Sequence, residues 1–149
     1  MNVAQNIETA AKLFPVKTAI LFEGRHIRYR QLNVAANRLA NAMQANGVKK
    51  GDRVALYLPN IPEFAICYLA TLKMGAIAVS VNPMLKAYEL KYILNDSGAG
   101  VLFTVGELLE NIDRKEYENL KHLVICEGDA QKNPELAAWT EKGTDEFRM

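Results

Sequence analysis

The stretch Val48–Phe64, VKKGDRVALYLPNIPEF, contains the pattern that decides the fold. Its Gly-Asp pair is followed by the apolar run Arg53–Leu58, by Pro-Asn, and by a second apolar segment that extends from Ile61 to Met74. The first run has the length and composition of a buried strand, and the second has those of a helix. The stretch therefore predicts a β–α unit, and such units often carry nucleotide sites.

The loop inside this unit lacks the features of a phosphate-binding loop. Such a loop places glycines after a strand and at the start of a helix, so that backbone N–H groups approach the anion. Here Gly51 precedes the strand, and the loop holds Pro59 and Pro62, which have no N–H donor. Asn60 suits a helix N-cap with Pro62 in the first turn. We interpret the stretch as scaffold.

The rest of the chain repeats the same alternation. Upstream we expect a helix over Asn2–Phe14, a hairpin of strands Thr18–Phe22 and His26–Tyr29, and a long helix over Gln31–Ala45. Downstream we expect a central strand Ala76–Val81, a helix Ala87–Asn95 ended by Gly98, a strand Val101–Val105, a polar helix Glu107–Leu120 and a strand Leu123–Cys126. This order predicts an α/β fold with a mostly parallel sheet flanked by helices and an N-terminal β-hairpin.

The overall composition indicates one domain with a real core, because half of the 149 residues are hydrophobic. We assign residues 1–126 to an α/β subdomain and 127–149 to a polar tail, with a short helical segment over Pro134–Lys142. A formal charge of +1 offers no electrostatic argument for nucleic-acid binding. The apolar stretch Phe64–Val81 contains Lys73, so we interpret it as a buried helix and strand, not a transmembrane segment.

The chemically reactive side chains form no recognisable site in the sequence. Cys67 and Cys126 lie far apart without a CxxC motif, so we expect small apolar packing groups in a reducing, cytoplasmic compartment, and no disulfide framework. The two histidines and two serines lack the neighbours that metal binding or nucleophilic catalysis requires. We place His26 in an exposed hairpin, His122 beside a short strand, Ser80 in a buried strand and Ser97 at a helix end.

Two further patterns are weak. Gly98-Ala99-Gly100 supplies two glycines of a GxGxxG motif, but Phe103 occupies the third place and the pair precedes a strand. The acidic residues between Glu107 and Glu118 are interspersed with Arg114 and Lys115, which is typical of a solvated face. The sequence therefore assigns no catalytic, cofactor-binding or metal-binding residue.

Six segments nevertheless match one known family in order and spacing. They are Tyr29-Arg30-Gln31-Leu32; Asn37-Arg38-Leu39-Ala40; Gly47-Val48 with Lys50-Gly51-Asp52-Arg53-Val54-Ala55; Leu58-Pro59-Asn60 with Pro62-Glu63-Phe64; Lys73-Met74-Gly75-Ala76 with Val81-Asn82-Pro83; and Glu89-Leu90 with Tyr92-Ile93-Leu94. In these segments the chain resembles the N-terminal portion of the adenylate-forming acyl-CoA synthetases, the AMP-binding ligases of the fatty-acyl-CoA type. The resemblance covers about the first 125 residues and fades after Cys126.

The resemblance implies a partial domain of the adenylate-forming fold within a longer synthetase. Such enzymes join a carboxylic acid to coenzyme A, using ATP and Mg²⁺, through an acyl-AMP intermediate. Their phosphate loop, adenine and metal segment, ribose carboxylate and mobile-domain lysine all lie downstream of this region. We therefore expect no bound cofactor and no activity in this chain alone, and we expect its partner to be the remainder of the synthetase.

Two questions stay open at this stage. A stand-alone α/β interaction module, homodimeric through an exposed sheet edge, is the alternative to a synthetase fragment. Met84, Leu85 and Tyr88 follow the Asn82-Pro83 turn and either pack in the core, which we favour, or approach an acyl channel.

The family also places Ser or Thr where Arg28 stands, so this chain retains only Gln31 from a helix capping box.

Overall fold

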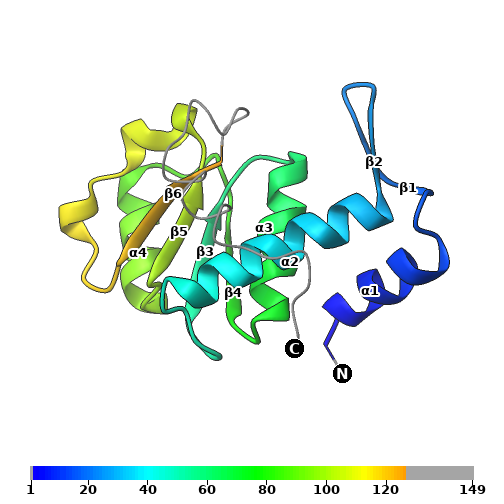
Figure 1. Cartoon of the computed structure of the whole chain (residues 1–149). Helices are drawn as coiled ribbons and strands as arrows, with labels where there is room; N and C mark the ends of the chain where they lie inside the picture. The colour runs from blue at the N-terminus through cyan, green and yellow to red at the C-terminus, as the bar shows by residue number, and fades with distance from the viewer. Residues whose placement is uncertain (1, 127–149) are drawn as a thin grey trace.

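The computed structural model describes residues 2–126 (Figure 1). Its elements are α1 (Ala4–Leu13), β1 (Thr18–Phe22), β2 (Arg25–Arg28), α2 (Tyr29–Ala45), β3 (Arg53–Tyr57), α3 (Pro62–Lys73), β4 (Ile77–Val81), α4 (Ala87–Ser97), β5 (Val101–Thr104), the 3₁₀ segments η1 (Gly106–Asn111) and η2 (Arg114–Glu116), and β6 (His122–Ile125). The helical segment expected at Pro134–Lys142 lies outside the described residues.

The strands form two sheets. β3, β4, β5 and β6 build a parallel sheet in the order β4-β3-β5-β6, and β1 pairs with β2 as an antiparallel hairpin. Helices lie on both sides of the parallel sheet: α2 and α3 on one side, and α4 with the 3₁₀ segments on the other (Figure 1). The predicted α/β class, the parallel sheet and the N-terminal hairpin are confirmed.

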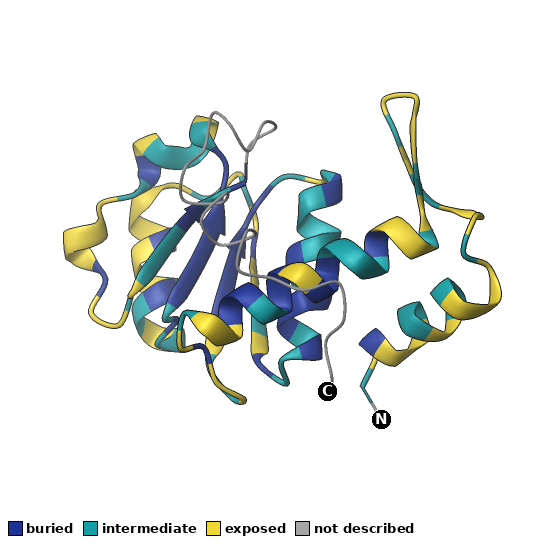
Figure 2. Cartoon of the chain, in the orientation of Figure 1, coloured by how far each residue is buried: buried dark blue, intermediate teal, exposed yellow. Residues whose placement is uncertain are grey.

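The core occupies the two interfaces between the sheet and its helices. On the α2–α3 side, Leu56 and Phe103 of the strands pack with Met43 and Cys67 of the helices. On the α4 side, alternate strand residues such as Tyr57 and Leu102 pack against the buried face of that helix. Figure 2 shows the buried positions concentrated in the sheet and the helix faces turned towards it. The strands alternate their side chains between the two faces, as the pleat requires.

The strand β4 corrects one prediction. Its apolar run suggested a central strand, but β4 pairs only with β3 among the described residues and stands at the edge of the sheet. Ile77 and Ser80 are accordingly exposed, so Ser80 does not lie in a buried strand. An apolar run in the sequence indicates a strand that can be buried, whereas the position of that strand in the sheet depends on which strands it pairs with.

The segment after β5 corrects a second prediction. A continuous polar helix over Glu107–Leu120 was expected, but the chain forms the two short 3₁₀ segments η1 and η2. Ile112 and Asp113 between them have extended backbone angles, and the Asp113 carboxylate accepts a hydrogen bond from the Lys115 N–H at 3.1 Å. Such local side-chain bonds compete with helix formation. The acidic residues of the segment are exposed, as expected.

The start of α3 corrects a third prediction. Ile61, not Asn60, is the N-cap residue, and its side chain makes no capping hydrogen bond. Pro62 occupies the first turn, as expected, where its missing N–H costs nothing. α3 is covered on several sides, because it contacts α1, α2, β3 and β4.

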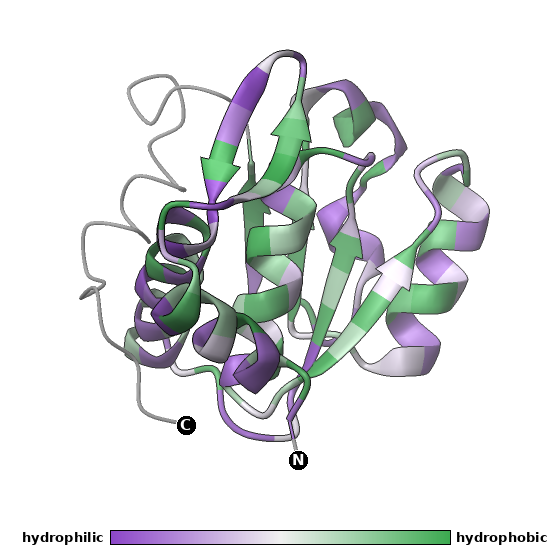
Figure 3. Ribbon diagram, turned by 90° about the vertical axis from the view of Figure 1, so that its right-hand side faces the viewer, coloured by the Kyte–Doolittle hydropathy of each residue, from purple (hydrophilic) through white to green (hydrophobic). Residues whose placement is uncertain are grey.

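The N-terminal elements pack on α2 and α3, away from the parallel sheet (Figures 1 and 3). Ala4 of α1 is buried with Leu32 and Leu69, and Ile7 is half-buried against them. Glu8 of α1 forms an ion pair with Lys73, whose side chain is fully buried at the end of α3. Val3 and Phe14, the residues that flank α1, are exposed.

Candidate functional site

The carboxyl ends of the parallel strands are the usual ligand-binding edge of an α/β sheet. At the end of β3 the Tyr57 side chain is buried, its hydroxyl donates to the Leu85 carbonyl at 2.5 Å, and it accepts from the Asn111 amide at 3.2 Å. Burial raises the pKa of Tyr57, and the Asn111 hydrogen bond partly offsets that rise. The tyrosine therefore stays protonated and ties the loop after β4 to η1.

The loops at these ends offer no cradle for a triphosphate. Pro59 follows β3, Pro83 follows β4, and Gly106 after β5 is a single glycine at the start of a 3₁₀ segment. Residues 2–126 hold no group of three or more His, Cys, Asp or Glu side chains placed to bind a metal ion. The side chains and loops of this part of the chain therefore do not fit ATP with its metal.

The residues after the Asn82-Pro83 turn answer the question left open by the sequence. Leu85 packs against the core on the α4 side. Met84 and Tyr88 are 81% and 84% exposed, so the core-packing interpretation was wrong for both. Tyr92, which is 67% exposed, follows Tyr88 by four residues on the same face of α4, and Met84 lies in the turn that precedes this helix. We call Met84, Tyr88 and Tyr92 the exposed stripe.

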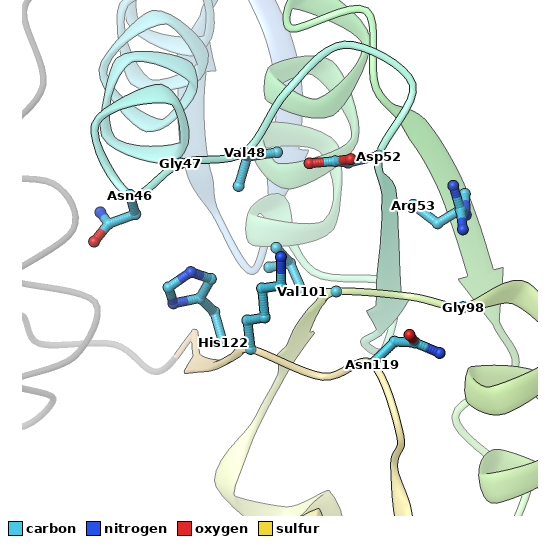
Figure 4. Close-up of a pocket in the computed structure, with 11 residues that line it drawn as sticks. Asn46, Gly47, Val48, Asp52, Arg53, Gly98, Val101, Asn119 and His122 are labelled. Atoms are coloured by element: carbon cyan, nitrogen blue, oxygen red, sulfur yellow. The ribbon is translucent and has the colours of Figure 1, made fainter.

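A polar pocket of about 210 Å³ lies at the opposite, amino ends of the strands (Figure 4). It lies between the loop that follows α2 and the segments that lead into β5 and β6. Its lining residues are Asn46, Gly47, Val48, Asp52, Arg53, Gly98, Gly100, Val101, Asn119, Lys121 and His122. The sequence did not predict this pocket, because its residues come from four separate segments.

Three polar side chains that line this pocket form hydrogen bonds with nearby backbone groups. Arg53 Nε donates to the Ser97 carbonyl at 2.8 Å, which ties β3 to the last turn of α4. Asp52 accepts the Lys49 N–H at 2.8 Å, and the Asn46 amide donates to the Ala42 carbonyl at 2.8 Å. No Ser, Thr or Cys nucleophile lines the pocket beside His122. These hydrogen bonds stabilise the turns that surround the pocket.

The other residues singled out from the sequence are spread over the molecule. His26 is exposed in the hairpin, as expected, with its Nδ1 3.1 Å from the Thr18 hydroxyl. His122 begins β6, and Ser97 ends α4 with its hydroxyl donating to the Leu94 carbonyl. Gly98 ends α4 in the left-handed conformation and precedes β5, which agrees with a helix stop and not a nucleotide motif.

The fold brings the two cysteines together, which the sequence did not predict. Cys67 lies within α3 and Cys126 directly follows β6, and their sulfurs are 3.8 Å apart in the core. Burial raises the pKa of the Cys67 thiol well above its usual range, and the neighbouring Cys126 raises it further. Both pack as small buried groups, as predicted. The sequence did not predict this contact, because 59 positions separate the two residues and only the folded core brings them together.

The described residues contain no helix that is long and apolar enough to cross a membrane. The apolar stretch Phe64–Val81 is divided between α3 and β4, as the interior Lys73 suggested. The ammonium of Lys73 is compensated by Glu8, so the helix carries this charge inside a globular core.

The chain matches curated proteins along part of their length. It is 36% identical over 143 residues to a 3-hydroxybenzoate–CoA/4-hydroxybenzoate–CoA ligase of Thauera aromatica, covering 93% of this chain and 27% of that protein. It is 42% identical over 96 residues to a long-chain-fatty-acid–CoA ligase of Bacillus subtilis, covering 64% of this chain and 17% of that protein. The chain thus spans less than a third of the length of these relatives.

Solved structures give the same likeness in three dimensions. An anthranilate CoA ligase in complex with anthranoyl-AMP superposes with a TM-score of 0.90 at 29% identity, covering 99% of this chain and 28% of that chain. A long-chain-fatty-acid–CoA ligase from Archaeoglobus fulgidus superposes with a TM-score of 0.88 at 26% identity, covering 99% and 31%.

The family model described as AMP-binding enzyme matches residues 7–148. This match extends past Cys126, where the motifs visible in the sequence fade. Because it covers nearly the whole chain, and because the sheet, hairpin and helices superpose on acyl-CoA ligases, the chain belongs to the AMP-binding enzyme family.

Proposed function

We propose that this chain is the N-terminal scaffold portion of an ATP-dependent acyl-CoA synthetase that is several times longer. The parent enzyme joins a carboxylic acid to coenzyme A and releases AMP and pyrophosphate. The observation that carries the proposal is the match of almost the whole chain to about a quarter of a CoA ligase. In this proposal ATP, Mg²⁺ and coenzyme A bind to residues downstream, and the chain has no activity by itself.

The described residues support a scaffold role. The carboxyl ends of the strands hold the buried, hydrogen-bonded Tyr57 and two proline-containing loops, and residues 2–126 hold no group of three or more His, Cys, Asp or Glu side chains placed to bind a metal ion. In the first step the carboxylate attacks the α-phosphate of ATP and pyrophosphate leaves, which requires donors placed at the phosphate charge that develops in the transition state. The side chains of residues 2–126 offer no such arrangement, so the chemistry is assigned to the remainder of the parent.

The exposed stripe and the edge of β4 are the surfaces that the remainder would cover. Met84, Tyr88 and Tyr92 are large, apolar or aromatic and mostly in solvent, and Ile77 of β4 is 52% exposed. Contiguous apolar surfaces and open strand edges favour association with another segment of protein. The proposal expects these groups to become buried in the longer synthetase.

The proposed substrate class is a fatty or aryl carboxylic acid. Relatives named for hydroxybenzoate and for long-chain fatty acids support this class. Other relatives are named for crotonobetaine and carnitine, so the choice within carboxylic acids rests on the parent's downstream pocket.

Exchange of pyrophosphate into ATP tests the scaffold role. The purified chain is incubated with ATP, Mg²⁺, labelled pyrophosphate and either a benzoate or a long-chain fatty acid. We expect no exchange above that of a heat-denatured sample, because the phosphate-binding groups are assigned elsewhere. An acid-dependent exchange signal from the chain alone would overturn the assignment of the chemistry to downstream residues.

A stand-alone interaction module is the second candidate, and the open edge of β4 favours it. In that case the edge and the exposed stripe would bind a second copy or a separate protein. Size-exclusion chromatography with light scattering separates the two candidates. A stable dimer that dissociates when Tyr88 is replaced by Lys supports the module, whereas self-association unaffected by Tyr88→Lys, or a monomer prone to aggregation, supports a surface meant for the remainder of the synthetase.

A further inference from the structure

We propose that Cys67 and Cys126 form a site of reversible oxidation, in which a hydroperoxide converts the two thiols into an intramolecular disulfide. The inference concerns this chain's own core and does not depend on the proposed function. It rests on the placement of two sulfur atoms, on the backbone that holds them, and on the cavity that reaches them.

The two sulfurs are already in contact. They are 3.8 Å apart, whereas bonded disulfide sulfurs lie about 2.0 Å apart, so a closer approach of about 1.8 Å brings them to bonding distance. They are also the only cysteines of the chain, so no other intramolecular pairing competes.

The backbone holds both thiols in place from elements that are distant in sequence. Cys67 lies in α3, where its carbonyl accepts the Thr71 hydroxyl at 2.8 Å. The Cys126 N–H donates to the Thr104 carbonyl of β5 at 2.7 Å, which continues the ladder of the sheet beyond β6. A bond between them would therefore join α3 covalently to the end of an edge strand.

A cavity gives a small oxidant a route to the pair. It has a volume of about 270 Å³ and lies between α2, α3 and the end of β6. Both cysteines contribute to its wall, together with Ala35, Arg38, Leu39, Glu63 and Ile66. Each cysteine is only 2% exposed, so a small molecule such as hydrogen peroxide is favoured over a bulky protein oxidant.

The chemistry balances with one hydroperoxide. One thiolate attacks a peroxide oxygen, the O–O bond breaks, and a sulfenic acid and one water form. The second thiol sulfur then attacks the sulfenic sulfur, the S–O bond breaks, and a second water leaves. Overall two thiols lose two electrons and two protons, and hydrogen peroxide becomes two waters. A dithiol such as dithiothreitol reverses the step by thiol–disulfide exchange.

The test treats the folded 149-residue chain with hydrogen peroxide and alkylates the remaining thiols under denaturing conditions. The treatment runs for hours, because burial raises the pKa of Cys67 and keeps its thiolate scarce. We expect the intact mass to fall by about 2 Da with no alkyl group added. Peptide mapping should show the peptides of Cys67 and Cys126 linked within one molecule, and dithiothreitol should restore two alkylatable thiols.

Matched variants complete the test. Cys67→Ser and Cys126→Ser each retain one thiol, so neither should form the internal link, and circular dichroism verifies that each is folded. In the 149-residue chain with both cysteines present, the melting temperature should rise on oxidation, because the disulfide closes a long loop in the unfolded chain.

Three results would overturn the proposal. The first is two fully alkylatable thiols after peroxide treatment of the folded chain. The second is a disulfide between two molecules, seen as a dimer on a non-reducing gel, and the third is a link that forms only when urea is present.

Discussion

At the scale of single residues, the first turns of α2 and α4 share an incomplete cap. Gln31 accepts the Arg28 N–H at 2.9 Å, and Glu89 accepts the Lys86 N–H at 3.1 Å. These bonds are one half of a capping box. The other half requires an oxygen on the N-cap side chain, and neither arginine nor lysine has an acceptor. Both helices therefore begin with a backbone N–H that no cap side chain satisfies.

Replacing Arg28 with Thr should complete the cap of α2. The new hydroxyl can accept the N–H of Gln31, and we expect the free energy of unfolding to rise by about 0.5–1 kcal/mol. Arg28→Val is the matched control, because valine has the shape of threonine without its oxygen. Urea denaturation measures both variants. Equal stability of the Thr and Val variants would show that the hydroxyl does not cap the helix.

Gly98 and Gly47 offer a second matched pair at this scale. Both have positive φ angles, 65° and 86°, but a Cβ on Gly98 would lie 2.9 Å from Arg53 Nη2, whereas Gly47 has open space. Gly47→Ala should cost about 1–2 kcal/mol, for the backbone alone. Gly98→Ala should cost more, since Arg53 must also give up its place against the Ser97 carbonyl. Equal losses in urea denaturation would mean that Arg53 moves aside freely.

At the scale of elements, α1 contacts α2 and α3 through the Glu8–Lys73 ion pair and a small apolar cluster. The Lys73 side chain is fully buried, whereas the carboxylate of Glu8 is 26% exposed. A buried ammonium without its partner is costly, while its replacement by an apolar side chain of similar size is often neutral.

Glu8→Gln should therefore lower the free energy of unfolding by roughly 1–3 kcal/mol. Adding Lys73→Met to this variant should recover most of the loss, because the unpaired charge is then gone. Urea denaturation of the two single variants and the double variant gives the coupling between the residues. If the effects of the single variants simply add, the ion pair does not hold α1 in place.

The elements also show which parts of the fold local sequence can predict. The apolar run of β3 and the periodic apolar face of α2 predicted a strand and a helix correctly, because the burial of such an element is reflected in the pattern of residues close together in the chain. The sequence did not predict the edge position of β4 or the Cys67–Cys126 contact, because both depend on contacts between segments that are distant in the chain. The break at Asp113 depends on a local hydrogen bond to the Lys115 N–H, which the expected polar helix did not take into account.

At the scale of the whole molecule, three buried acids link stability to pH. Burial is the largest cause of a raised pKa for Tyr57, Cys67 and Tyr117. Each group holds its proton more tightly in the folded chain than in the unfolded chain. Their contribution to stability is therefore complete at neutral pH and is lost as pH rises.

We expect the free energy of unfolding to fall steadily above about pH 9. Urea denaturation at a series of pH values measures the slope, and the double variant Cys67→Ala/Tyr117→Phe should show a shallower one. Stability that is constant or increasing from about pH 9 to about pH 11 would contradict the role of these three groups.

The candidate site follows the same division between local and distant signals. The lack of a phosphate loop was apparent from Pro59 and Pro62, which are local features. The polar pocket at the amino ends of the strands could not be predicted from the sequence, because Asp52, Gly98 and His122 come together only in the folded sheet. The sequence likewise did not predict the exposed stripe, because Met84 and Tyr88 are residue types that are often buried in a core.

The central claim is that this chain is the first part of a longer acyl-CoA synthetase, and the coding sequence beyond Met149 tests it most directly. We predict an open frame that continues into a Ser/Thr/Gly-rich segment ending in Pro-Lys-Gly, followed by the rest of the ligase. A stop codon directly after Met149 would contradict the claim and favour the stand-alone interaction module.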